Sequence, residues 1–482
     1  MASARRLRSL HYWASATKRR VVVAGVVALG ATFAVGTQQS ASSAPIKPVV
    51  TTQWLQYHGD AVGSGVAVGI TAVRTSTRKW TSPTLDGEIY GEPLVYKNEV
   101  IVATENNSIY ALSATTGAIL WTRHVAAAVP SSELPCGDIS PTVGITGTPV
   151  IDPLRHEVFA VALEMSTGKA EHYMYGLNVN NGATMSRVFL PTGTPHESQG
   201  GAPYLQRSAL ALDDGSVIFT MGGNYGDCPL YHGEVGAVNE SGHGGTPAVF
   251  VVDSGPGESQ GAVWMGGGAP AVDAAGHVWV ETGNGSQTSP RGPYDDSDGV
   301  LELTATMHLK AFFAPTTWAS DNAHDADLSD TPALTSNGQV VATGKSGMVY
   351  LLNAAHLGGI GGQEAEVNSD CGNDLDGGVT IHGNIVYLPC LSGPVAVRVG
   401  TAPASLKVIW RAQEGGGPPI LAAQRIWTIG QNGVLYGLNP NTGAVLQQAS
   451  IGTPANHFPT PSVGAGLLLA ANANQVVAFS AH

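Results

Sequence analysis

Short apolar runs alternate along most of this chain with turns rich in Gly, Asn and Asp. Residues 108–125 read SIYALSATTGAILWTRHV, in which a Thr-Thr-Gly turn separates two apolar runs and Trp121 lies in the second. Similar stretches begin at Tyr173 and Val434. Short apolar runs bounded by such turns are typical of β-strands joined as hairpins. The pattern therefore predicts an all-β protein built from a repeated hairpin.

The first strand of this hairpin recurs eight times, as IYALS, MYGLN, VFVVD, VLELT, VYLLN, VAVRV, LYGLN and VVAFS. The copies are about 52 residues apart, a spacing within the range of propeller blades. Another predicted strand pair precedes each copy, for example in residues 91–104 and 268–282. Each unit is thus predicted to have four strands. We expect one eight-bladed β-propeller over residues 51–482.

The two ends of this region predict how the ring closes. The chain stops at His482, directly after the eighth copy, so the last blade lacks an outer strand. Residues 75–83, TSTRKWTSP, resemble an outer strand, with Trp80 in the place of Trp121. We expect this N-terminal strand to complete the last blade, which would remove two open sheet edges. Trp121, Trp264 and Trp410 are expected to pack between blades.

The form Ala-Leu-x-x-x-Thr-Gly-x-x-x-Trp of residues 111–121 resembles the pyrroloquinoline quinone (PQQ) repeat. That repeat builds the propellers of quinoprotein alcohol dehydrogenases and also of the propeller lipoprotein of outer-membrane protein assembly, which is not an enzyme. The resemblance covers nearly the whole chain after the N-terminal segment. It implies a PQQ-like β-propeller, and it leaves open whether the chain binds a quinone.

Residues 1–44 differ from the rest of the chain. Six Lys and Arg residues precede the apolar run Val21–Gly36, which is followed by small and polar residues. This order predicts an export signal, with an uncleaved membrane anchor as the alternative. The whole chain has a net charge of −13 and no basic stripe beyond this segment, which argues against nucleic-acid binding. We therefore expect an exported protein, extracellular, periplasmic or in the cell envelope.

Four cysteines fit an oxidised, exported protein with two disulfides: Cys136, Cys228, Cys371 and Cys390. Three pairings are possible. In an antiparallel blade the loop entering the first strand and the loop after the second lie on one face, which favours Cys371–Cys390 and Cys136–Cys228. The long, irregular loops of the chain gather on this same face, where a ligand site is expected.

The resemblance implies particular site residues on that face. Quinoprotein alcohol dehydrogenases carry, in order, a tryptophan under the quinone, an asparagine that binds calcium, an aspartate base and a basic residue that contacts the quinone. By motif these correspond to Trp264, Asn284 in GNGS, Asp325 in HDAD and Lys345 in GKSG. Glu164 is a looser match to a calcium-binding glutamate. The implied cofactors are PQQ and calcium.

Each of these residues also has a structural interpretation. Gly-Asn-Gly is a common tight turn, Asp325 lies in an acidic loop that suits solvent, Lys345 fits a turn, and Glu164 fits a structural role. The vicinal cysteine pair of the enzymes is absent. Weaker clusters occur at Asp227, His232 and Glu234, and at Asp295, Asp296 and Asp298.

Two functions follow from these observations. The first is an exported binding or scaffold propeller, with a small molecule or a protein as partner on the loop-rich face. The alternative is a calcium- and PQQ-dependent alcohol oxidoreductase with a degenerate site. For both we expect a monomer that contacts a membrane only if the N-terminal segment is retained.

Overall fold

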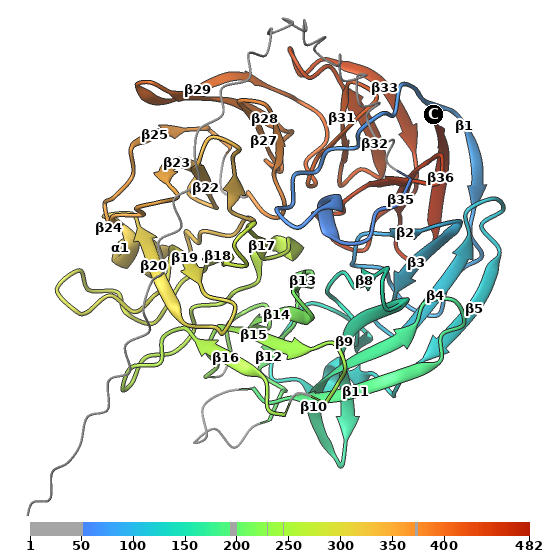
Figure 1. Cartoon of the computed structure of the whole chain (residues 1–482), viewed down its shortest axis with the longest axis horizontal. Helices are drawn as coiled ribbons and strands as arrows, with labels where there is room; N and C mark the ends of the chain where they lie inside the picture. The colour runs from blue at the N-terminus through green and yellow to red at the C-terminus, as the bar shows by residue number, and fades with distance from the viewer. Residues whose placement is uncertain (1–51, 193–199, 229, 244, 372–374) are drawn as a thin grey trace, which may run out of the picture. The chain divides into compact units, whose positions relative to one another are not determined.

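Antiparallel sheets follow one another around a central axis in the described part of the chain (Figure 1). The computed structural model describes residues 52–192, 200–228, 230–243, 245–371 and 375–482. The described residues all lie within the unit Pro48–His482. The predicted export segment, residues 1–44, lies outside the described residues. Among the described residues, no helix has the length and apolar character needed to cross a bilayer.

Eight blades make up the ring, and each has four antiparallel strands in the order expected from the repeat. Blades 1 to 3 consist of β2–β5 (Leu94–Tyr96, Glu99–Ala103, Ser108–Ser113, Ile119–His124), β8–β11 (Val150–Asp152, Glu157–Ser166, Lys169–Asn178, Thr184–Leu190) and β13–β16 (Ala211–Asp213, Ser216–Gly223, Glu234–Asn239, Ala248–Val251). Blades 4 and 5 consist of β17–β20 (Ala271–Val272, Val278–Thr282, Gly299–Leu303, Leu309–Ala314) and of β21, β22, β23 and β25 (Ala333–Leu334, Gln339–Thr343, Met348–Asn353, Ala365–Asn368). Blades 6 and 7 consist of β26–β29 (Thr380–His382, Ile385–Leu388, Val395–Thr401, Ala404–Arg411) and β30–β33 (Ile420–Ala422, Arg425–Ile429, Val434–Leu438, Val445–Ser450).

Blade 8 combines the two ends of the described chain. Its strands β34 (Ser462–Gly464), β35 (Leu467–Ala471) and β36 (Val476–Ala481) come from the C-terminus. The outer strand is β1 (Val73–Thr81), which pairs antiparallel with β36, so that Trp80 lies opposite Ala478. This is the ring closure that the sequence predicts. The all-β, eight-bladed fold is confirmed.

Short elements occupy the connections between and beside the blades. They are β6 (Val129–Pro130), β7 (Thr142–Val143), β12 (Tyr204–Leu205), β24 (Gly359–Ile360), the helix α1 (Trp318–His324) and the 3-10 turns η1 (Tyr57–Gly59), η2 (Ser131–Glu133) and η3 (Met265–Gly267). β24 adds in parallel to the outer edge of β20. The apolar side chains of neighbouring sheets pack against each other, so the core is distributed around the ring between the blades.

Outer-strand tryptophans connect one blade to the next. Their indole N–H groups donate to backbone carbonyl oxygens of the following blade, in the pairs Trp80–Ala114, Trp121–Val179 and Trp410–Pro440, at 2.8, 3.0 and 2.9 Å. Trp121 and Trp410 thus lie between blades, as expected. Trp264 is different, because it precedes the first strand of blade 4 and reaches the central axis.

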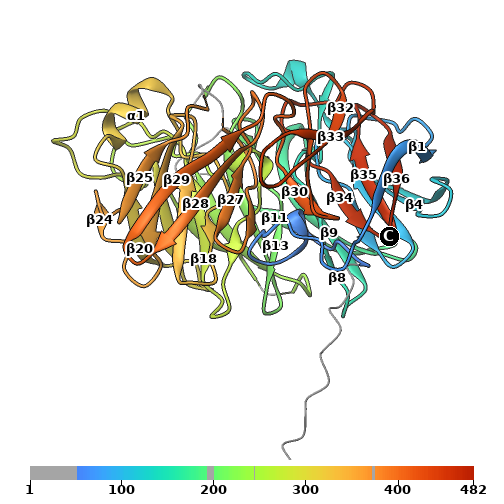
Figure 2. The same cartoon turned by 90° about the horizontal axis from the view of Figure 1, so that it is seen from above.

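Residues 54–67 form a strap that crosses the ring from the inside. Its backbone hydrogen-bonds to the first strand of five blades, through Val95, Ile151, Val272, Ile381 and Leu421. Trp54, Tyr57 and His58 of the strap are buried. Figure 2 shows the ring from its side, with the strap (blue) towards the end of the blades opposite to α1. The strap therefore covers the central axis on the face that carries the short turns.

Candidate functional site

Long loops between blades, and between the second and third strands within blades, gather on the face that carries α1. Two disulfides connect loops of this face. Cys136 pairs with Cys228, with 6.1 Å between their Cα atoms, and Cys371 pairs with Cys390 at 5.3 Å. These are the two pairs that the loop geometry favours. The first links blades 2 and 3, and the second closes a loop within blade 6.

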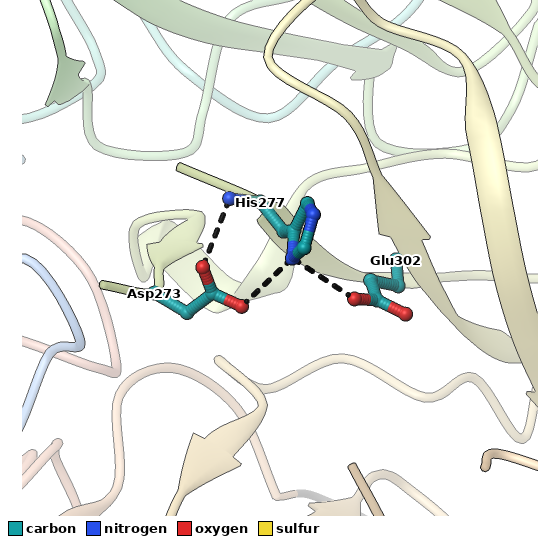
Figure 3. Close-up of side chains that lie close together, drawn as sticks. All are labelled: Asp273, His277 and Glu302. Atoms are coloured by element: carbon teal, nitrogen blue, oxygen red, sulfur yellow. Dashed lines mark hydrogen bonds and ion pairs between the residues drawn. The ribbon is translucent and has the colours of Figure 1, made fainter. Parts of the chain in front are cut away.

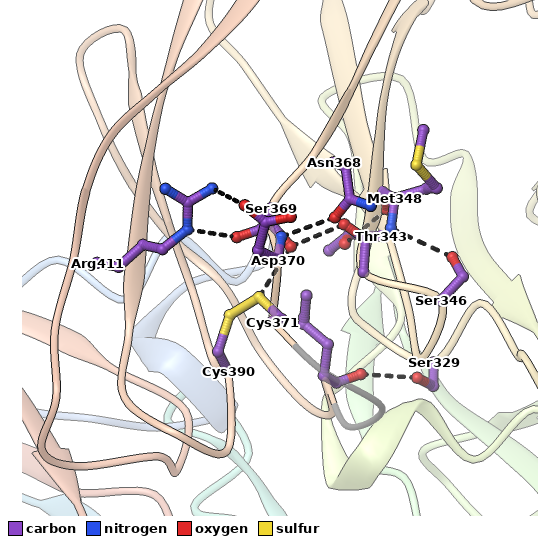
Figure 4. Close-up of a disulfide and its surroundings, with 12 residues drawn as sticks. Ser329, Thr343, Ser346, Met348, Asn368, Ser369, Asp370, Cys371, Cys390 and Arg411 are labelled. Atoms are coloured by element: carbon purple, nitrogen blue, oxygen red, sulfur yellow. Dashed lines mark hydrogen bonds and ion pairs between the residues drawn. A yellow bond between two sulfur atoms is a disulfide. The ribbon is translucent and has the colours of Figure 1, made fainter.

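The Cys371–Cys390 disulfide also supports the loop that carries Lys345 (Figure 4). The hydroxyl of Ser369, two residues before Cys371, donates to the carbonyl oxygen of Gly347 at 2.7 Å. On its other side, the Arg411 guanidinium donates to the Ser369 carbonyl oxygen at 2.8 Å and pairs with Asp370 at 2.7 Å. The segment before the disulfide is therefore held between blades 5 and 6, and it in turn positions the Gly344–Gly347 turn.

Three of the residues that the sequence singled out meet around an aspartate that it did not. Asp327 is buried, and its Oδ1 accepts a hydrogen bond from the backbone N–H of Asn284 at 2.7 Å. Its Oδ2 lies 2.8 Å from the Nζ of Lys345 and accepts a hydrogen bond from the Trp264 indole at 3.3 Å. The Lys345 ammonium also lies 5.1 Å from the centre of the Trp264 ring. Asp327 is thus the hub of this site.

Asp325, the expected base, lies at the edge of this group. It follows helix α1 with a positive φ of 55°, and its side chain is 67% exposed. One oxygen, Oδ1, pairs with Lys345 at 2.9 Å. Lys345 is therefore held between Asp325 and Asp327. Burial opposes the charge of Lys345, but these two carboxylates outweigh it and raise the pKa of the ammonium.

Glu164, the expected second calcium ligand, lies elsewhere and is already bonded. It is on β9 in blade 2, where its carboxylate accepts hydrogen bonds from the Tyr175 hydroxyl and the Arg187 guanidinium. The Arg187 guanidinium stacks 3.4 Å from the centre of the Tyr173 ring. This network ties β9, β10 and β11 together. Among the described residues no hydrogen bond or ion pair links Glu164 to Asn284, so calcium binding by this pair stays a prediction.

Aromatic rings and a buried arginine meet near the central axis next to Trp264. The Trp264 ring lies 6.2 Å from that of Phe458, which comes from the loop that enters blade 8 on the far side of the ring. The guanidinium of Arg207 lies 4.6 Å from the Phe458 ring centre and 5.7 Å from that of Tyr90. Arg207 is only 6% exposed, whereas the three aromatic side chains are half-buried. We call Tyr90, Arg207, Trp264 and Phe458 the axial cluster.

The charge of Arg207 is not neutralised by a direct ion pair with a carboxylate among the described residues. Its neighbours are aromatic rings, and Glu105 interacts with it only at longer range. Burial lowers the pKa of Arg207, against the attraction of Tyr90 and Glu105. Burial also disfavours the charged form of Glu105 and raises its pKa to about 7, although hydrogen bonds from Gly144 and Thr146 act in the opposite direction. A buried guanidinium with half-buried rings beside it is a setting that favours an anionic ligand.

Sequence reasoning missed Tyr90, Arg207 and Phe458, although the repeat contains a signal for them. Each lies four residues before the first strand of its blade, since those strands begin at Leu94, Ala211 and Ser462. In a propeller the first strand is innermost, so the residues just before it approach the axis. Aligning the repeats on the first strand would have brought these residues together.

Asp227 lies next to Cys228 on the same loop-rich face. It is close enough to Asp327 and Lys345 to interact with them electrostatically. Its Oδ1 accepts a hydrogen bond from the buried Tyr231 at 2.7 Å. The site therefore combines two cations, Arg207 and Lys345, with carboxylates that already hold the second of them. Arg207 is the cation that remains available to a ligand.

Comparisons with known proteins agree with this architecture. A family model described as outer membrane protein assembly factor BamB, which is built on PQQ repeats, matches residues 61–202. A search of curated protein sequences finds no match. The resemblance to the PQQ-like β-propeller family that the repeat indicates is confirmed.

Solved structures with the same fold include alcohol dehydrogenases and BamB. A quinohemoprotein alcohol dehydrogenase from Comamonas testosteroni superposes with a TM-score of 0.61 at 13% identity, over 90% of this chain and 81% of that one. BamB from Moraxella catarrhalis gives 0.55 at 14% identity, over 84% and 99%. A europium-containing methanol dehydrogenase gives 0.61 at 14% identity, over 87% and 89%. At these identities the likeness concerns the fold.

Proposed function

We propose that this chain is an exported binding propeller that takes a flat, anionic small molecule at the axial cluster. Arg207 is the observation that carries the proposal. It is a buried cation that contacts aromatic rings instead of a carboxylate, and an unpaired buried charge is costly unless a partner completes it. An anionic group on a ligand would supply that partner.

The aromatic members of the cluster favour a flat ligand. Tyr90, Trp264 and Phe458 are half-buried, so part of each ring is open to a bound molecule. Pockets that bind small molecules are typically lined by aromatic side chains with a few well-placed polar groups. Because the strap covers the axis on the other face, we propose that the ligand enters from the loop-rich face.

Asp327, Lys345 and Trp264 favour a second candidate, a quinoprotein-like oxidoreductase. If PQQ were bound, it would supply a two-electron acceptor beside an aspartate and a lysine. The hydrogen bonds and ion pairs of Asp327 and Lys345 argue against a catalytic role for these residues. Asp327 accepts from three donors, and Lys345 is paired with two carboxylates, so neither group is free for a substrate proton or a quinone oxygen. Glu164 is paired with Arg187, which would have to release it before it could bind calcium.

Export of the mature chain is part of the same proposal. Its support is the N-terminal sequence and the two disulfides, since such bonds persist in oxidising compartments. A protein partner on the loop-rich face stays an alternative occupant. Tyr225 and Leu230, beside Cys228, are 75% and 65% exposed there and would suit such a contact.

The experiment is a titration of the exported protein with PQQ, used as a flat tricarboxylate probe, with and without calcium. Quenching of tryptophan fluorescence reports binding near Trp264, and dye reduction with primary alcohols reports turnover. Arg207→Gln is compared with Arg398→Gln, which removes an exposed arginine from β28 in blade 6.

Binding without turnover, weakened at least tenfold by Arg207→Gln and unchanged by Arg398→Gln, would support the binding propeller. Calcium-dependent turnover that Asp327→Asn abolishes would support the oxidoreductase. If neither PQQ nor a panel of aromatic carboxylates binds, or if both arginine variants bind as the wild type does, the proposed site is refuted.

A further inference from the structure

A second group of polar side chains lies in blade 4 (Figure 3). It is at the turn between β17 and β18, on the face opposite to the candidate site. It consists of Asp273, His277 and Glu302, whose nearest ligand atoms all lie within 4.8 Å of one another. The Nδ1 of His277 is 3.1 Å from Oδ2 of Asp273 and 3.2 Å from Oε1 of Glu302. This group has no part in the function proposed above.

The local sequence explains why these side chains meet. Asp273 and His277 are the two ends of the tight turn DAAGH between β17 and β18, where Gly276 takes a φ of +77°. Asp273 holds this turn with its own Oδ1, which accepts hydrogen bonds from the backbone N–H groups of Ala275 and His277. Its Oδ2 is directed towards the imidazole. Glu302 lies on β19 opposite Trp279, which brings its carboxylate beside the same imidazole.

The two distances from the histidine are compatible with a small divalent ion. Ligands of a tetrahedral zinc ion with bonds of about 2.0 Å are about 3.3 Å apart, close to the two distances from the histidine. One imidazole nitrogen and two carboxylate oxygens, from a turn and a neighbouring strand, would give a zinc ion three protein ligands and leave its fourth tetrahedral position open. Glu302 is 3% exposed, while Asp273 and His277 are about one quarter exposed, so solvent reaches the group from one side.

Charges around the group also favour a cation. Asp213, from the neighbouring blade 3, lies close to the turn, since its Oδ1 is 3.2 Å from where a Gly276 Cβ would be. Three carboxylates, those of Asp213, Asp273 and Glu302, thus lie around His277. One lysine also reaches the group: the Nζ of Lys310 lies 2.5 Å from Glu302 Oε1. Lys310 is 45% exposed and can move into solvent when an ion takes its place.

We propose that Asp273, His277 and Glu302 form a zinc-binding site, with the fourth position open to water. The Trp279 indole donates to Asp273 Oδ2 at 3.1 Å and so fixes the orientation of this ligand. The site joins the inner turn of blade 4 to its third strand and lies about 20 Å from Asn284, across the length of β18. It is thus separate from the axial cluster.

The test is equilibrium dialysis of the full chain against zinc, with the bound metal counted, and with cobalt as a spectroscopic probe of tetrahedral geometry. His277→Ala should weaken zinc binding more than tenfold because it removes the single nitrogen ligand. His308→Ala is the matched control, since His308 lies in the outer turn of the same blade and its ring hydrogen-bonds with the Thr306 hydroxyl at 3.1 Å. Lys310→Met keeps all three ligands and removes the competing cation, so it should tighten zinc binding several-fold.

One equivalent of zinc in the wild type and in His308→Ala, lost in His277→Ala, would support the site. Absence of bound zinc, or equal binding by His277→Ala and the wild type, would overturn it. If His277→Ala fails to fold, Lys310→Met decides the matter: tighter binding supports the site, and unchanged binding identifies the group as an ion-pair network without a metal.

Discussion

The indole of Trp121 donates a hydrogen bond to the carbonyl oxygen of Val179 at 3.0 Å, and its ring lies against Gly182 of the next blade. A Cβ on Gly182 would be 2.6 Å from the ring. The same arrangement recurs twice, and in each case the accepting residue comes three positions before the glycine: Trp80 with Ala114 and Gly117, and Trp410 with Pro440 and Gly443. The glycine and the tryptophan of the repeat therefore meet across blade boundaries.

This contact predicts that Gly182→Ala destabilises the propeller. Gly182 has a φ of +68°, so any side chain is strained there, and the new methyl group must displace the Trp121 ring. Overpacking costs about 1–3 kcal/mol and the left-handed backbone about 1–2 kcal/mol. We expect a loss of about 2–4 kcal/mol in the free energy of unfolding, measured by urea denaturation.

Gly168→Ala provides the matched control. Gly168 has a φ of +81° in the turn between β9 and β10, but nothing lies within 4 Å of the position of its Cβ. Only the backbone cost applies there, about 1–2 kcal/mol. If the two variants lose equal stability, the tryptophan contact contributes nothing and the interpretation of the repeat is wrong.

Repetition is the reason that the fold could be predicted from the sequence. The Thr-Gly turn and the tryptophan recur because each serves one contact between neighbouring blades. Trp80 indicated the closing strand because it stands in for the missing outer tryptophan of blade 8, and the pairing of β1 with β36 agrees. The strap of residues 54–67 has no copy in the repeat, so the pattern could not reveal it.

The site was less predictable because its residues come from single loops that do not repeat. The motif HDAD contains two aspartates, and sequence alone could not tell the exposed Asp325 from the buried Asp327. The difference arises because α1 ends at His324, after which the chain turns back so that Asp327 faces Asn284 and Lys345. Glu164 was predicted as a calcium ligand because it lies near the end of the second strand of its blade. In the structure its carboxylate forms an ion pair with Arg187, which lies on β11 opposite Tyr175.

The bonding of Glu164 yields a prediction that separates a structural role from a metal role. Glu164→Gln removes the charge that holds the Arg187 guanidinium and the Tyr175 hydroxyl, and should lower the free energy of unfolding by about 1–2 kcal/mol. Binding of PQQ, with or without calcium, should not change, as measured by fluorescence titration. Glu171→Gln, directly opposite on β10, is the control and should cost less than about 1 kcal/mol. A calcium effect on PQQ binding that disappears in Glu164→Gln alone would show that this residue is a ligand after all.

The two disulfides should contribute unequally to stability. Cys371–Cys390 spans 19 residues and Cys136–Cys228 spans 92. From loop-closure entropy, replacement of each pair by serine should cost about 3 kcal/mol for the shorter loop and about 5 kcal/mol for the longer. Thermal unfolding of the two double variants, each compared with the wild type under oxidising conditions, measures this order. A larger loss from the shorter loop would mean that its support of the Gly344–Gly347 turn outweighs chain entropy.

Asp253 predicts how stability depends on pH. Its side chain is 1% exposed, and burial, followed by the charge of Asp295, raises its pKa to about 9 from an ordinary value of 3.8. Between about pH 4 and pH 9 the folded protein therefore holds a proton that the unfolded chain releases, so stability falls as pH rises, by up to about 1.4 kcal/mol per pH unit. Asp253→Asn is neutral in both states and should make this slope shallower, although buried Glu105 still contributes to it, and its melting temperature should exceed that of the wild type at pH 8. Glu133→Gln, which removes an exposed carboxylate, should keep the slope of the wild type. If Asp253→Asn and the wild type lose stability in parallel from pH 5 to pH 8, Asp253 is ionised in the folded protein and a cation must lie beside it.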